Sequence, residues 1–600
     1  MPHTLIQKIF ARHTTEPVTV DTIIELAIDL RAARDFGGAN VVTHLQDHDL
    51  PIADPTKTLF TFDCNPGGCD QKYAVNQHLC RQYARTHHIP ITDINQGIGT
   101  HLVVDTGRIA PGDTFVSTDS HANILGAIGA FGQGMGDIDI AYAFAHGTTW
   151  FKVPPTTRIT LKGTPTTQTT AKDVVLKITK DLGANGLLGS AAELTGPYPD
   201  HLTLDQRMTI ASMGTEMGAI ILLFPPNEAI RASYHQTHHR TIPPLTADPD
   251  AAYDQDLTID IDGLPPQLSR PGHPEDVASV HDCEGTPIDS GFIGSCTNGR
   301  LEDLRAAAAI LKGRTIAPGR ILKIVPATDA IWNTCLEEGL LKIFKDAGAL
   351  IGSAGCAGCA AGQIGQTGTG EVTVSTGNRN FTGKQGKGDI YLASPQTVAA
   401  SLIAGYITTA ATIPPTPSSL PRTAAAPSQK KQEPTTHHPP MRLEGKAWVI
   451  PQDNIDTDAI YHNKYLTVTT LSEMGQFTFA SFKGHESFAK NAAPGDILVT
   501  GKNFGCGSSR QQAVDCFKSL GISLIIAESF GAIYERNAIN SAFAILTLPA
   551  ATSQTATGDR LTVDLATGTI TNTTKKRTLQ AKPFSPVQRS IYERGGLLER

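Results

Sequence analysis

The sequence has few features of a membrane, secreted or nucleic-acid-binding protein. Aromatic side chains make up only 6% of its 600 residues. It has no run of about 20 apolar residues, so we expect no membrane span. The first residues, MPHTLIQKIFARHTTEP, lack an apolar stretch, so we expect no secretory signal. No basic tract occurs, and 50 basic against 57 acidic residues give a net charge of −7, so we expect no nucleic-acid partner.

Cysteine is also sparse, with ten irregularly placed residues. This spacing does not suggest a disulfide framework, and it favours free thiols or metal ligands in a reducing compartment, most simply the cytoplasm. The G-x-x-x-x-G-K-[ST] loop and the G-x-S-x-G elbow are both missing, so neither a P-loop nor a serine hydrolase is indicated. Apolar content of 40% and charged content of 18% are typical of a globular protein.

One break in composition divides the chain. Residues 413–440 are rich in proline, serine, threonine and alanine, which predicts an extended linker before a smaller unit that begins near Met441. On both sides, apolar runs alternate with helical patterns, as in parallel α/β proteins. We expect a strand at 114–119, a glycine-rich helix packed closely after it, and a helix from Leu301 that Thr297 or Asn298 caps. Gly521 is placed to end another helix.

Three cysteines carry the chemical interpretation: Cys296 in GSCTNGR, and Cys356 and Cys359 in GCAGC. Three thiolates can hold a [4Fe–4S] cluster and leave one iron without a protein ligand, so that the cluster acts as a Lewis acid. A zinc site with a fourth ligand is the alternative that spacing leaves open. Cys64, Cys69 and Cys335 are candidates for that ligand.

Other polar clusters accompany these cysteines. The loop at 378–384 offers Asn378, Arg379 and Lys384 as an anion site. A second cluster is Asp119-Ser120-His121, with His101 upstream and Glu193 as a further carboxylate, and it suits acid–base chemistry. In the last part, Ser508, Ser509 and Arg510 lie at an expected helix start, where helix amides and a guanidinium would stabilise a serine alkoxide.

Together these motifs resemble the aconitase superfamily, which includes aconitase, 3-isopropylmalate dehydratase and homoaconitase. The motifs TDSH, GSCTNGR, GCAGC, NRNFTG, DNIDTD and GCGSSR occur along nearly the whole chain, with SFGAIYERNAIN after them. The resemblance implies an α/β fold of three domains around an iron–sulfur cluster plus a linked, swivelling C-terminal β/α domain. We expect aconitase-like domains 1 and 2 at 1–285, the cluster-bearing domain 3 at 286–412, the linker at 413–440 and the swivelling domain at 441–600. Both subunit types would then be fused, and we expect a monomer.

The resemblance also implies a hydro-lyase that moves a hydroxyl group between adjacent carbons of a hydroxy di- or tricarboxylic acid, through a cis-unsaturated intermediate. It assigns the cluster ligands as Cys296, Cys356 and Cys359. The implied catalytic set is Ser508 as the base, with Asp63, His101, Asp119, His121 and Glu193. The implied substrate-binding set is Ser120, Asn378, Arg379, Lys384, Ser509, Arg510 and Arg536.

The chain departs from the family pattern at several positions. Asp63-Cys64 stands where an Asp-His pair is usual, and Thr100-His101 where His-Gln is usual. Lys384 replaces an arginine, and Phe530-Gly531-Ala532-Ile533 lacks a substrate-binding arginine. These changes argue against a true citrate aconitase.

The loop that reads the substrate's variable arm contains Tyr465-Leu466-Thr467 and no arginine, which favours an apolar or small arm. We therefore expect a 3-isopropylmalate dehydratase-like enzyme. Aconitase, homoaconitase and a secondary-metabolism isomerase are alternatives within the family. A non-catalytic, RNA-binding apo-protein is the alternative of another class.

Overall fold

The computed structural model describes residues 2–67, 71–415, 440–466, 468 and 470–598. Most of the predicted linker, together with Cys69 and Thr467, lies outside the described residues. The chain forms two compact units. The first consists of Met1–Phe36, Asp54–Gln133 and Thr148–Ala426, and the second of Gly37–Ala53, Gly134–Gly147 and Pro427–Arg600.

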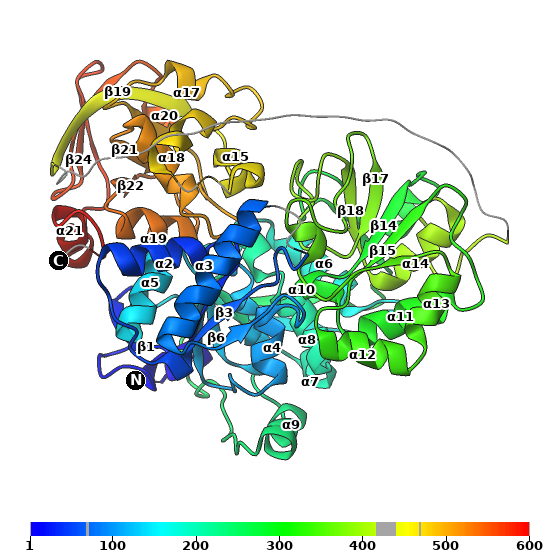
Figure 1. Cartoon of the computed structure of the whole chain (residues 1–600). Coiled ribbons are helices and arrows are strands. Elements are labelled where there is room, and N and C mark those ends of the chain that lie inside the picture. Colours follow the sequence, from blue (N-terminus) through cyan, green and yellow to red (C-terminus); the bar gives the residue numbers. More distant parts are fainter. Residues whose placement is uncertain (1, 68–70, 416–439, 467, 469, 599–600) are drawn as a thin grey trace. The chain divides into compact units, whose positions relative to one another are not determined.

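The first sheet of unit 1 has the order β4-β3-β2-β5-β6. Its strands β3 and β6 are labelled in Figure 1. Its strands are β2 (Leu30–Arg34), β3 (Thr58–Thr61), β4 (Ile91–Thr92), β5 (Thr114–Ser117) and β6 (Phe131–Gly134). The neighbours β2, β3 and β5 run parallel. Every residue of these three strands is buried, as expected for a sheet with both faces covered. Because parallel strands end at the same edge, Arg34, Asp63 and Asp119 are brought together.

The second sheet is parallel throughout, in the order β10-β9-β8-β11. Its strands are β8 (Thr156–Lys162), β9 (Ala191–Thr195), β10 (Ile221–Leu223) and β11 (Gln255–Asp260). Helices α6 (Ala171–Leu182) and α8 (Leu204–Ala211) contact each other beside it. Thr170 and Asp173 form a capping box that fixes the start of α6.

The third sheet of unit 1 has the order β13-β12-β18-β17-β14-β15-β16. Its parallel part is β14 (Ser290–Ile293), β15 (Ile321–Ile324), β16 (Leu350–Ile351), β17 (Val372–Ser375) and β18 (Asp389–Ala393). The antiparallel strands are β12 (Gln267–Ser269) and β13 (Val277–Ser279). Helices α11 (Leu301–Leu311) and α14 (Pro395–Ala404) pack on each other. The cysteine loops follow β14 and β16, and the Asn378 loop follows β17.

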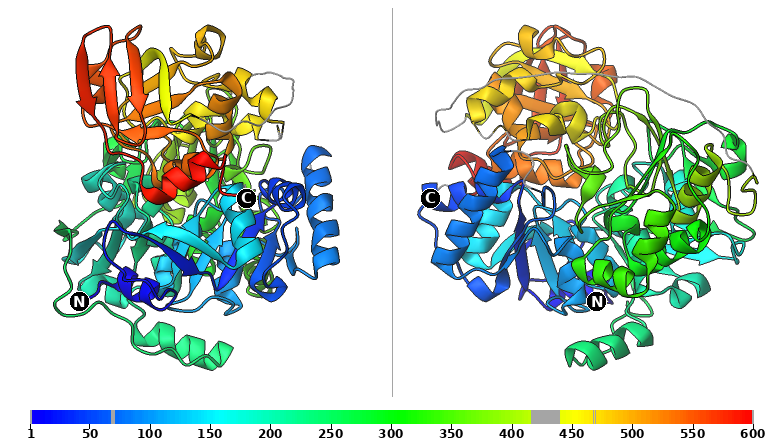
Figure 2. Two further views of the ribbon diagram at one scale, coloured as in Figure 1. Left: turned by 90° about the vertical axis from the view of Figure 1, so that its left-hand side faces the viewer. Right: turned by 45° about the vertical axis from the view of Figure 1, so that its right-hand side comes forward.

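Unit 2 contains a seven-stranded sheet in the order β22-β21-β20-β19-β23-β24-β25. The long strand β19 (Arg442–Ile450) runs parallel to β20 (Ile497–Thr500) and antiparallel to β23 (Arg560–Asp564). The remaining strands are β21 (Leu524–Ala527), β22 (Ile545–Thr547), β24 (Thr569–Asn572) and β25 (Arg577–Gln580). Figure 2 shows the antiparallel strands in red at one end of this sheet.

Four helices of unit 2 contain residues discussed below or pack on a helix that does. Helix α18 (Gln512–Leu520) precedes β21, and α19 (Ala532–Asn540) follows it. The other two, α2 (Gly38–Asp47) and α5 (Asp137–His146), come from the first quarter of the sequence. They pack on each other, and α19 also contacts α5.

The α/β class is confirmed, as are the strand expected at 114–119 and the helix that ends at Gly521, whose φ is 76°. Two local expectations are wrong. The glycine-rich stretch is a 3₁₀ turn (Ala122–Ile128), strand β6 and helix α5 rather than one helix. The N-cap of α11 is Arg300, because Thr297 and Asn298 belong to the separate short helix α10 (Ser295–Asn298).

The domain boundaries proposed at 285/286 and 412/413 stay predictions. Among the described residues, no helix is long and apolar enough to cross a bilayer.

Candidate active site

Arg34 and two carboxylates form the polar centre of the first sheet. Arg34 lies at the end of β2, with Nε 2.8 Å from Asp63 Oδ1 and Nη1 3.0 Å from Asp119 Oδ1. All three residues are buried. Burial raises the pKa of Asp63 to about 6, although the charge of Arg34 opposes this. At Asp119, burial is outweighed by the charges of Arg34 and His121, and the pKa falls below its usual value.

The same guanidinium reaches the second cysteine loop. Arg34 Nη2 donates a hydrogen bond to Cys356 Sγ at 2.5 Å, and the Cys356 amide donates to the Asp63 carbonyl at 2.9 Å. Asp63 Oδ2 also accepts the Gly99 amide at 2.8 Å. The first sheet thus positions one of the predicted cluster ligands directly.

The three predicted ligands gather around a short 3₁₀ turn, η5 (Ala357–Cys359). Cys296 lies in α10, which contacts η5, and Cys356 and Cys359 flank the turn. Burial raises the pKa of the Cys296 thiol, and the neighbouring Cys359 and Cys356 raise it further. Cationic groups surround these thiols, since Lys384, Arg379 and Arg34 act on Cys359. Three convergent thiols in a positive environment fit an anionic iron–sulfur cluster.

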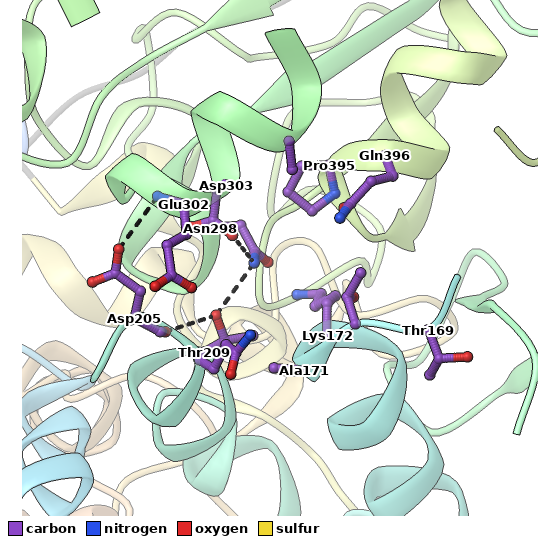
Figure 3. Close-up of a pocket in the computed structure, with 13 residues that line it drawn as sticks. Thr169, Ala171, Lys172, Asp205, Thr209, Asn298, Glu302, Asp303, Pro395 and Gln396 are labelled. Carbon is purple, nitrogen blue, oxygen red and sulfur yellow. Dashed lines mark hydrogen bonds between the residues drawn. The ribbon is translucent and has the colours of Figure 1, made fainter. Parts of the chain in front are cut away.

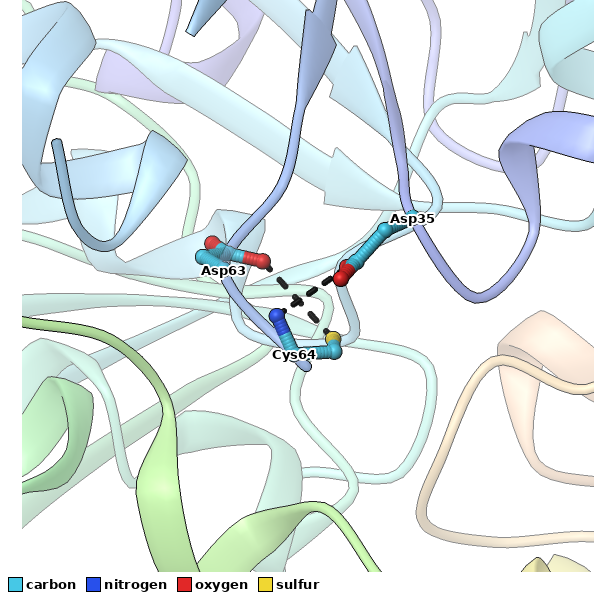
Figure 4. Close-up of side chains that lie close together, drawn as sticks. All are labelled: Asp35, Asp63 and Cys64. Atoms are coloured by element: carbon cyan, nitrogen blue, oxygen red, sulfur yellow. Dashed lines mark hydrogen bonds between the residues drawn. The ribbon is translucent and has the colours of Figure 1, made fainter. Parts of the chain in front are cut away.

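Cys64 occupies the position where the family usually has a histidine, and it lies at the edge of this site. Its Sγ is 3.7 Å from Asp63 Oδ1, while Asp35 accepts its amide at 3.0 Å (Figure 4). Burial raises the pKa of the Cys64 thiol, and Cys356 raises it further. Ligand atoms of Asp35, Asp63 and Cys64 lie within 4.8 Å of one another. Donors already engage both carboxylates, so we assign no second metal there.

His121 forms an acid–base pair with a residue that the sequence analysis missed. Its Nε2 lies 3.3 Å from Glu216 Oε1, and Arg379 Nε donates to the same oxygen at 2.6 Å. Burial opposes ionisation of Glu216, but Arg379 and His121 outweigh it and lower the pKa to about 2. Burial and Arg379 lower the pKa of His121. We therefore expect a neutral imidazole that contacts a carboxylate.

Glu193, predicted as a site carboxylate, is engaged elsewhere. It lies on β9, where Oε1 accepts the Leu5 amide at 2.5 Å and Oε2 accepts the Tyr253 hydroxyl at 2.9 Å. Neither partner belongs to the cysteine group or to the His121 group. Its contacts anchor the first helix, α1 (Leu5–Ala11), so the structure places Glu216, not Glu193, beside His121.

His101 lies behind the cysteine loop. Its Nδ1 is 3.3 Å from the guanidinium of Arg300, and its Nε2 is 3.0 Å from the Cys296 carbonyl. Arginine can only donate and a carbonyl can only accept, so His101 carries its proton on Nε2. Burial, with Arg300, lowers its pKa to about 3. The residue is fully buried, and both ring nitrogens are engaged, which suits a positioning role better than proton transfer to a substrate.

The remaining predicted residues of unit 1 also collect here. Asn378 Oδ1 lies 3.4 Å from Cys296 Sγ, and its Nδ2 donates to the Ser212 carbonyl at 3.3 Å. Ser120 Oγ lies 3.5 Å from His121 Nδ1. Asn378, Arg379 and Lys384 are all buried.

In unit 2, the motif Ser508-Ser509-Arg510 contacts the acidic motif at 453–458. Arg510 binds Asp458 through two contacts of 2.7 and 2.8 Å, and its Nη2 lies 3.4 Å from Ser508 Oγ. Thr457 Oγ1 donates to the Ser508 carbonyl at 3.0 Å. Helix α18 begins at Gln512, so the serines precede the helix rather than start it. The position of Ser508 is fixed by side-chain contacts instead.

Two further predicted residues of unit 2 bind groups from the N-terminal segment. Ser509 Oγ donates to the Met135 carbonyl at 2.5 Å. Arg536 Nε donates to Asp139 Oδ1 at 2.6 Å, and Asp139 lies on α5. Burial lowers the pKa of Arg536 despite this carboxylate.

The chain matches two family models along most of its length. Residues 7–405 match the aconitase family (aconitate hydratase), and residues 441–551 match the aconitase C-terminal domain.

Named relatives match at moderate identity. The 3-isopropylmalate dehydratase large subunit of Nitratidesulfovibrio vulgaris is 38% identical over 415 residues, which are 68% of this chain and 99% of the relative. The homoaconitase large subunit of Thermus thermophilus is 36% identical over 414 residues, 68% of this chain and 97% of the relative. The mitochondrial homoaconitase of Debaryomyces hansenii is 32% identical over 591 residues, 90% of this chain and 85% of the relative.

These matches confirm the resemblance inferred from the motifs. Aconitase-family proteins typically bind a [4Fe–4S] cluster, and the cysteine geometry described above fits that group. The N-terminal aconitase part and the C-terminal swivel part, which some relatives make as separate subunits, are joined in one polypeptide. The chain therefore belongs to the aconitase family and is a hydro-lyase of that family with both parts fused.

Proposed function

We propose that Cys296, Cys356 and Cys359 hold a [4Fe–4S] cluster in this chain. The support is the convergence of three thiols from two loops within a cationic shell. Lys172 extends that shell, because its charge acts on both Cys296 and Cys359. When bound, such a cluster supplies a Lewis-acidic iron for the substrate's hydroxyl and carboxylate oxygens.

We further propose that the substrate is an alkyl-substituted malate, as for 3-isopropylmalate dehydratase. One observation carries this choice: the loop expected to read the variable arm is aromatic. Tyr465 stacks on Phe477 with ring centroids 4.1 Å apart, and Tyr461 packs edge-on against both. Tyr461 and Phe477 are buried and Tyr465 is partly exposed, so Tyr465 is the ring that can meet the substrate and favour an apolar arm over a carboxylate.

The following roles are proposed for the predicted side chains of each unit. Ser508 removes the proton next to a substrate carboxylate, and Arg510, held by Asp458, stabilises the serine oxygen. His121, whose Nε2–H is held by Glu216, contacts the substrate's hydroxyl group through Nδ1. Asp63 and Asp119 orient Arg34, and His101 fixes the Cys296 turn. The groups proposed to bind substrate carboxylates are Ser120, Asn378, Arg379, Lys384, Ser509, Arg510 and Arg536.

Homoaconitase is the second candidate. It is favoured because the mitochondrial homoaconitase of Debaryomyces hansenii also aligns across both parts, over 90% of this chain. That enzyme class would need a cation for an extra carboxylate, and Lys464 lies 4.7 Å from the Tyr465 ring centroid.

The test begins with protein purified without oxygen. Iron and sulfide are counted, and turnover of 3-isopropylmalate, homocitrate and citrate is followed by the ultraviolet absorbance of the unsaturated product. We expect a coloured protein with about four irons per chain and the highest kcat/KM on 3-isopropylmalate. Preference for homocitrate would replace the first candidate with the second. A zinc-containing, colourless protein would overturn both.

A further inference from the structure

Lys172 is a fully buried cation on helix α6, and its ammonium group faces the turn that follows β17. Nζ donates to the carbonyls of Thr376 at 3.2 Å and Gly377 at 2.7 Å, and it lies 3.9 Å from the sulfur of Met213. Within the described part of the chain, Lys172 forms no ion pair with a carboxylate. Its charge therefore lacks the partner that a buried cation normally has.

Carboxylates in a neighbouring pocket do not supply that partner. Lys172 lines a polar pocket of about 270 Å³, and Asp205, Glu302 and Asp303 line the same pocket. Figure 3 shows the three acidic side chains on the other side of the pocket from Lys172. Asp205 and Asp303 instead accept hydrogen bonds from Arg300, through its guanidinium and its amide. The pocket therefore does not explain why residue 172 carries a charge.

The position is also unfavourable for a positive charge. Burial lowers the pKa of Lys172 to about 8, although the charge of Glu216 opposes the change. Lys172 is moreover the second residue of α6, and a helix N-terminus carries a partial positive charge that repels a cation. A methionine of similar length would fill the space without either cost. A packing role alone does not explain the charge.

The carbonyls that bind the ammonium group belong to a turn with two predicted site residues. Residues 376–377 directly precede Asn378 and Arg379 in the sequence. Asn378 Oδ1 accepts a hydrogen bond from Cys296 Sγ at 3.4 Å, and Arg379 Nε donates to Glu216 Oε1 at 2.6 Å. The ammonium group therefore fixes the backbone just before the amide at the cysteine site and just before the arginine proposed for a substrate carboxylate.

Thr376 also joins this turn to the loop of Cys296. Its Oγ1 accepts the amide of Gly294 and donates to the carbonyl of the same residue, both at 2.9 Å. Gly294 lies two residues before Cys296. Through Thr376, Lys172 supports both the turn with Arg379 and the start of the cysteine loop. All of these residues belong to unit 1.

Arg207 shows the same kind of buried cation away from the site. It lies on α8, is buried, and donates to the carbonyls of Pro225 at 2.9 Å and Pro199 at 3.1 Å. The acidic group that acts on its charge is Asp200. None of these residues was predicted as a site residue. Burial and carbonyl binding therefore serve packing at Arg207, and what distinguishes Lys172 is the turn that it holds.

We propose that Lys172 is a positioning residue of the active site, whose ammonium group holds the turn with Asn378 and Arg379 and whose charge balances an anionic cluster. The inference rests on the proposed function, because Cys296 and Cys359 as thiolate ligands then supply negative charge close to Lys172. Without the ammonium group, Arg379 loses its fixed backbone and binds a substrate carboxylate more weakly. The cluster also becomes harder to reduce, because a nearby positive charge favours the more negative reduced state.

The test compares Lys172→Met with the matched control Arg207→Met, both purified without oxygen. KM and kcat are measured with the best of the three hydroxy acids, and the reduction potential of the cluster is measured by a redox titration followed by electron paramagnetic resonance. For Lys172→Met we expect KM to rise at least about tenfold, with a smaller change in kcat. We also expect its reduction equilibrium constant to fall about tenfold, which lowers the potential by about 59 mV for one electron. Arg207→Met should lower the free energy of unfolding without changing KM or the potential.

A second variant separates the charge from the hydrogen bonds and also serves if Lys172→Met does not fold. Lys172→Gln keeps an N–H donor for one carbonyl but has no charge. Its potential should fall as far as that of Lys172→Met, and its KM should rise less. Loss of iron from both lysine variants, with folding preserved in circular dichroism spectra and Arg207→Met fully loaded, would also support the role of the charge.

Three results would overturn the inference. They are an unchanged KM and potential in both lysine variants, equal changes in Arg207→Met, and unfolding of both lysine variants, which would leave Lys172 a role in stability alone. Iron content and turnover of the unchanged protein are measured first. An unchanged protein without a cluster would refute the proposed function and this inference with it, whereas a loaded, active protein with unaffected lysine variants would refute this inference alone.

Discussion

Arg34 Nη2 lies 2.5 Å from the sulfur of Cys356, so a residue at the end of the second strand contacts a predicted cluster ligand more than 300 residues away. The same guanidinium neutralises Asp63 and Asp119, which are both buried. The side chain of Arg34 therefore links the first sheet, the two carboxylates and the loop that carries Cys356.

Replacing Arg34 with methionine should lower both stability and iron content. The change leaves two buried carboxylates without their cation, and breaking a buried pair costs about 3–5 kcal/mol. Denaturant unfolding measures the loss of free energy, and iron is counted on the same sample. Arg305→Met, which breaks the half-exposed pair with Glu338, should cost less than about 1 kcal/mol. Equal losses in the two variants would contradict the role given to Arg34.

Two carboxylates should behave differently when each is changed to glutamine. Glu216→Gln should lower kcat by about 10²–10⁴, because His121 loses the carboxylate that fixes its ring and tautomer. Glu193→Gln should leave kcat per iron-loaded enzyme within about twofold, because that carboxylate only anchors α1 and Tyr253. Glu193→Gln should instead lower the free energy of unfolding by about 1.5–3 kcal/mol, because it weakens charge-assisted hydrogen bonds. The reverse pattern would restore Glu193 as the site carboxylate.

His101 should make stability depend on pH. Its pKa in the folded state is about 3, against 6.5 in the unfolded chain, so below pH 6.5 the unfolded state binds the extra proton. Stability is therefore lost as pH falls, by about 2 kcal/mol between pH 7 and pH 5 for this group. In urea unfolding, the free energy of unfolding of His101→Gln should fall by about 2 kcal/mol less between pH 7 and pH 5 than that of the unchanged protein. An unchanged fall would show that His101 takes up its proton freely in the folded state.

The serine motif can be tested without disturbing the cysteines. Ser508→Ala should reduce kcat by at least about 10² while iron content stays constant. Asp458→Asn should cause a smaller loss, because Arg510 keeps its contact with the Tyr461 carbonyl at 3.1 Å but loses its carboxylate. Ser553→Ala, a change at an exposed serine, is the matched control. Full activity in Ser508→Ala would assign the base to another residue.

The alternation of apolar runs with helical patterns predicted the α/β class, and the resemblance to the aconitase superfamily assigned the three cysteines to one site. Their meeting follows from a general property of parallel sheets, whose loops meet at the carboxyl ends of the strands. Asp63, Asp119 and Asn378 each follow such a strand, and so each could be predicted. Arg34 also ends a buried strand, and that position was the available signal for it.

The surroundings of Glu216, Glu193 and His101 could not be predicted from the sequence, for a different reason. Glu216 lies in a 3₁₀ turn between glycines and methionines, where a lone charge in an apolar stretch was the only hint. Glu193 ends up beside Leu5 because two segments 188 residues apart meet, which no local pattern encodes. His101 lies in a helix whose sequence pattern indicates that the residue is buried, but the pattern does not indicate which loop the ring contacts.

The membership of α2 and α5 in unit 2 has a consequence for dividing the gene. A cut within residues 413–440 would leave these two helices on the N-terminal polypeptide, while α19, which contacts α5, would be on the other. Each product would then lose contacts that the intact chain makes, among them the buried Arg536–Asp139 pair. Co-expression of the halves should yield a soluble assembly more readily than refolding of either half alone.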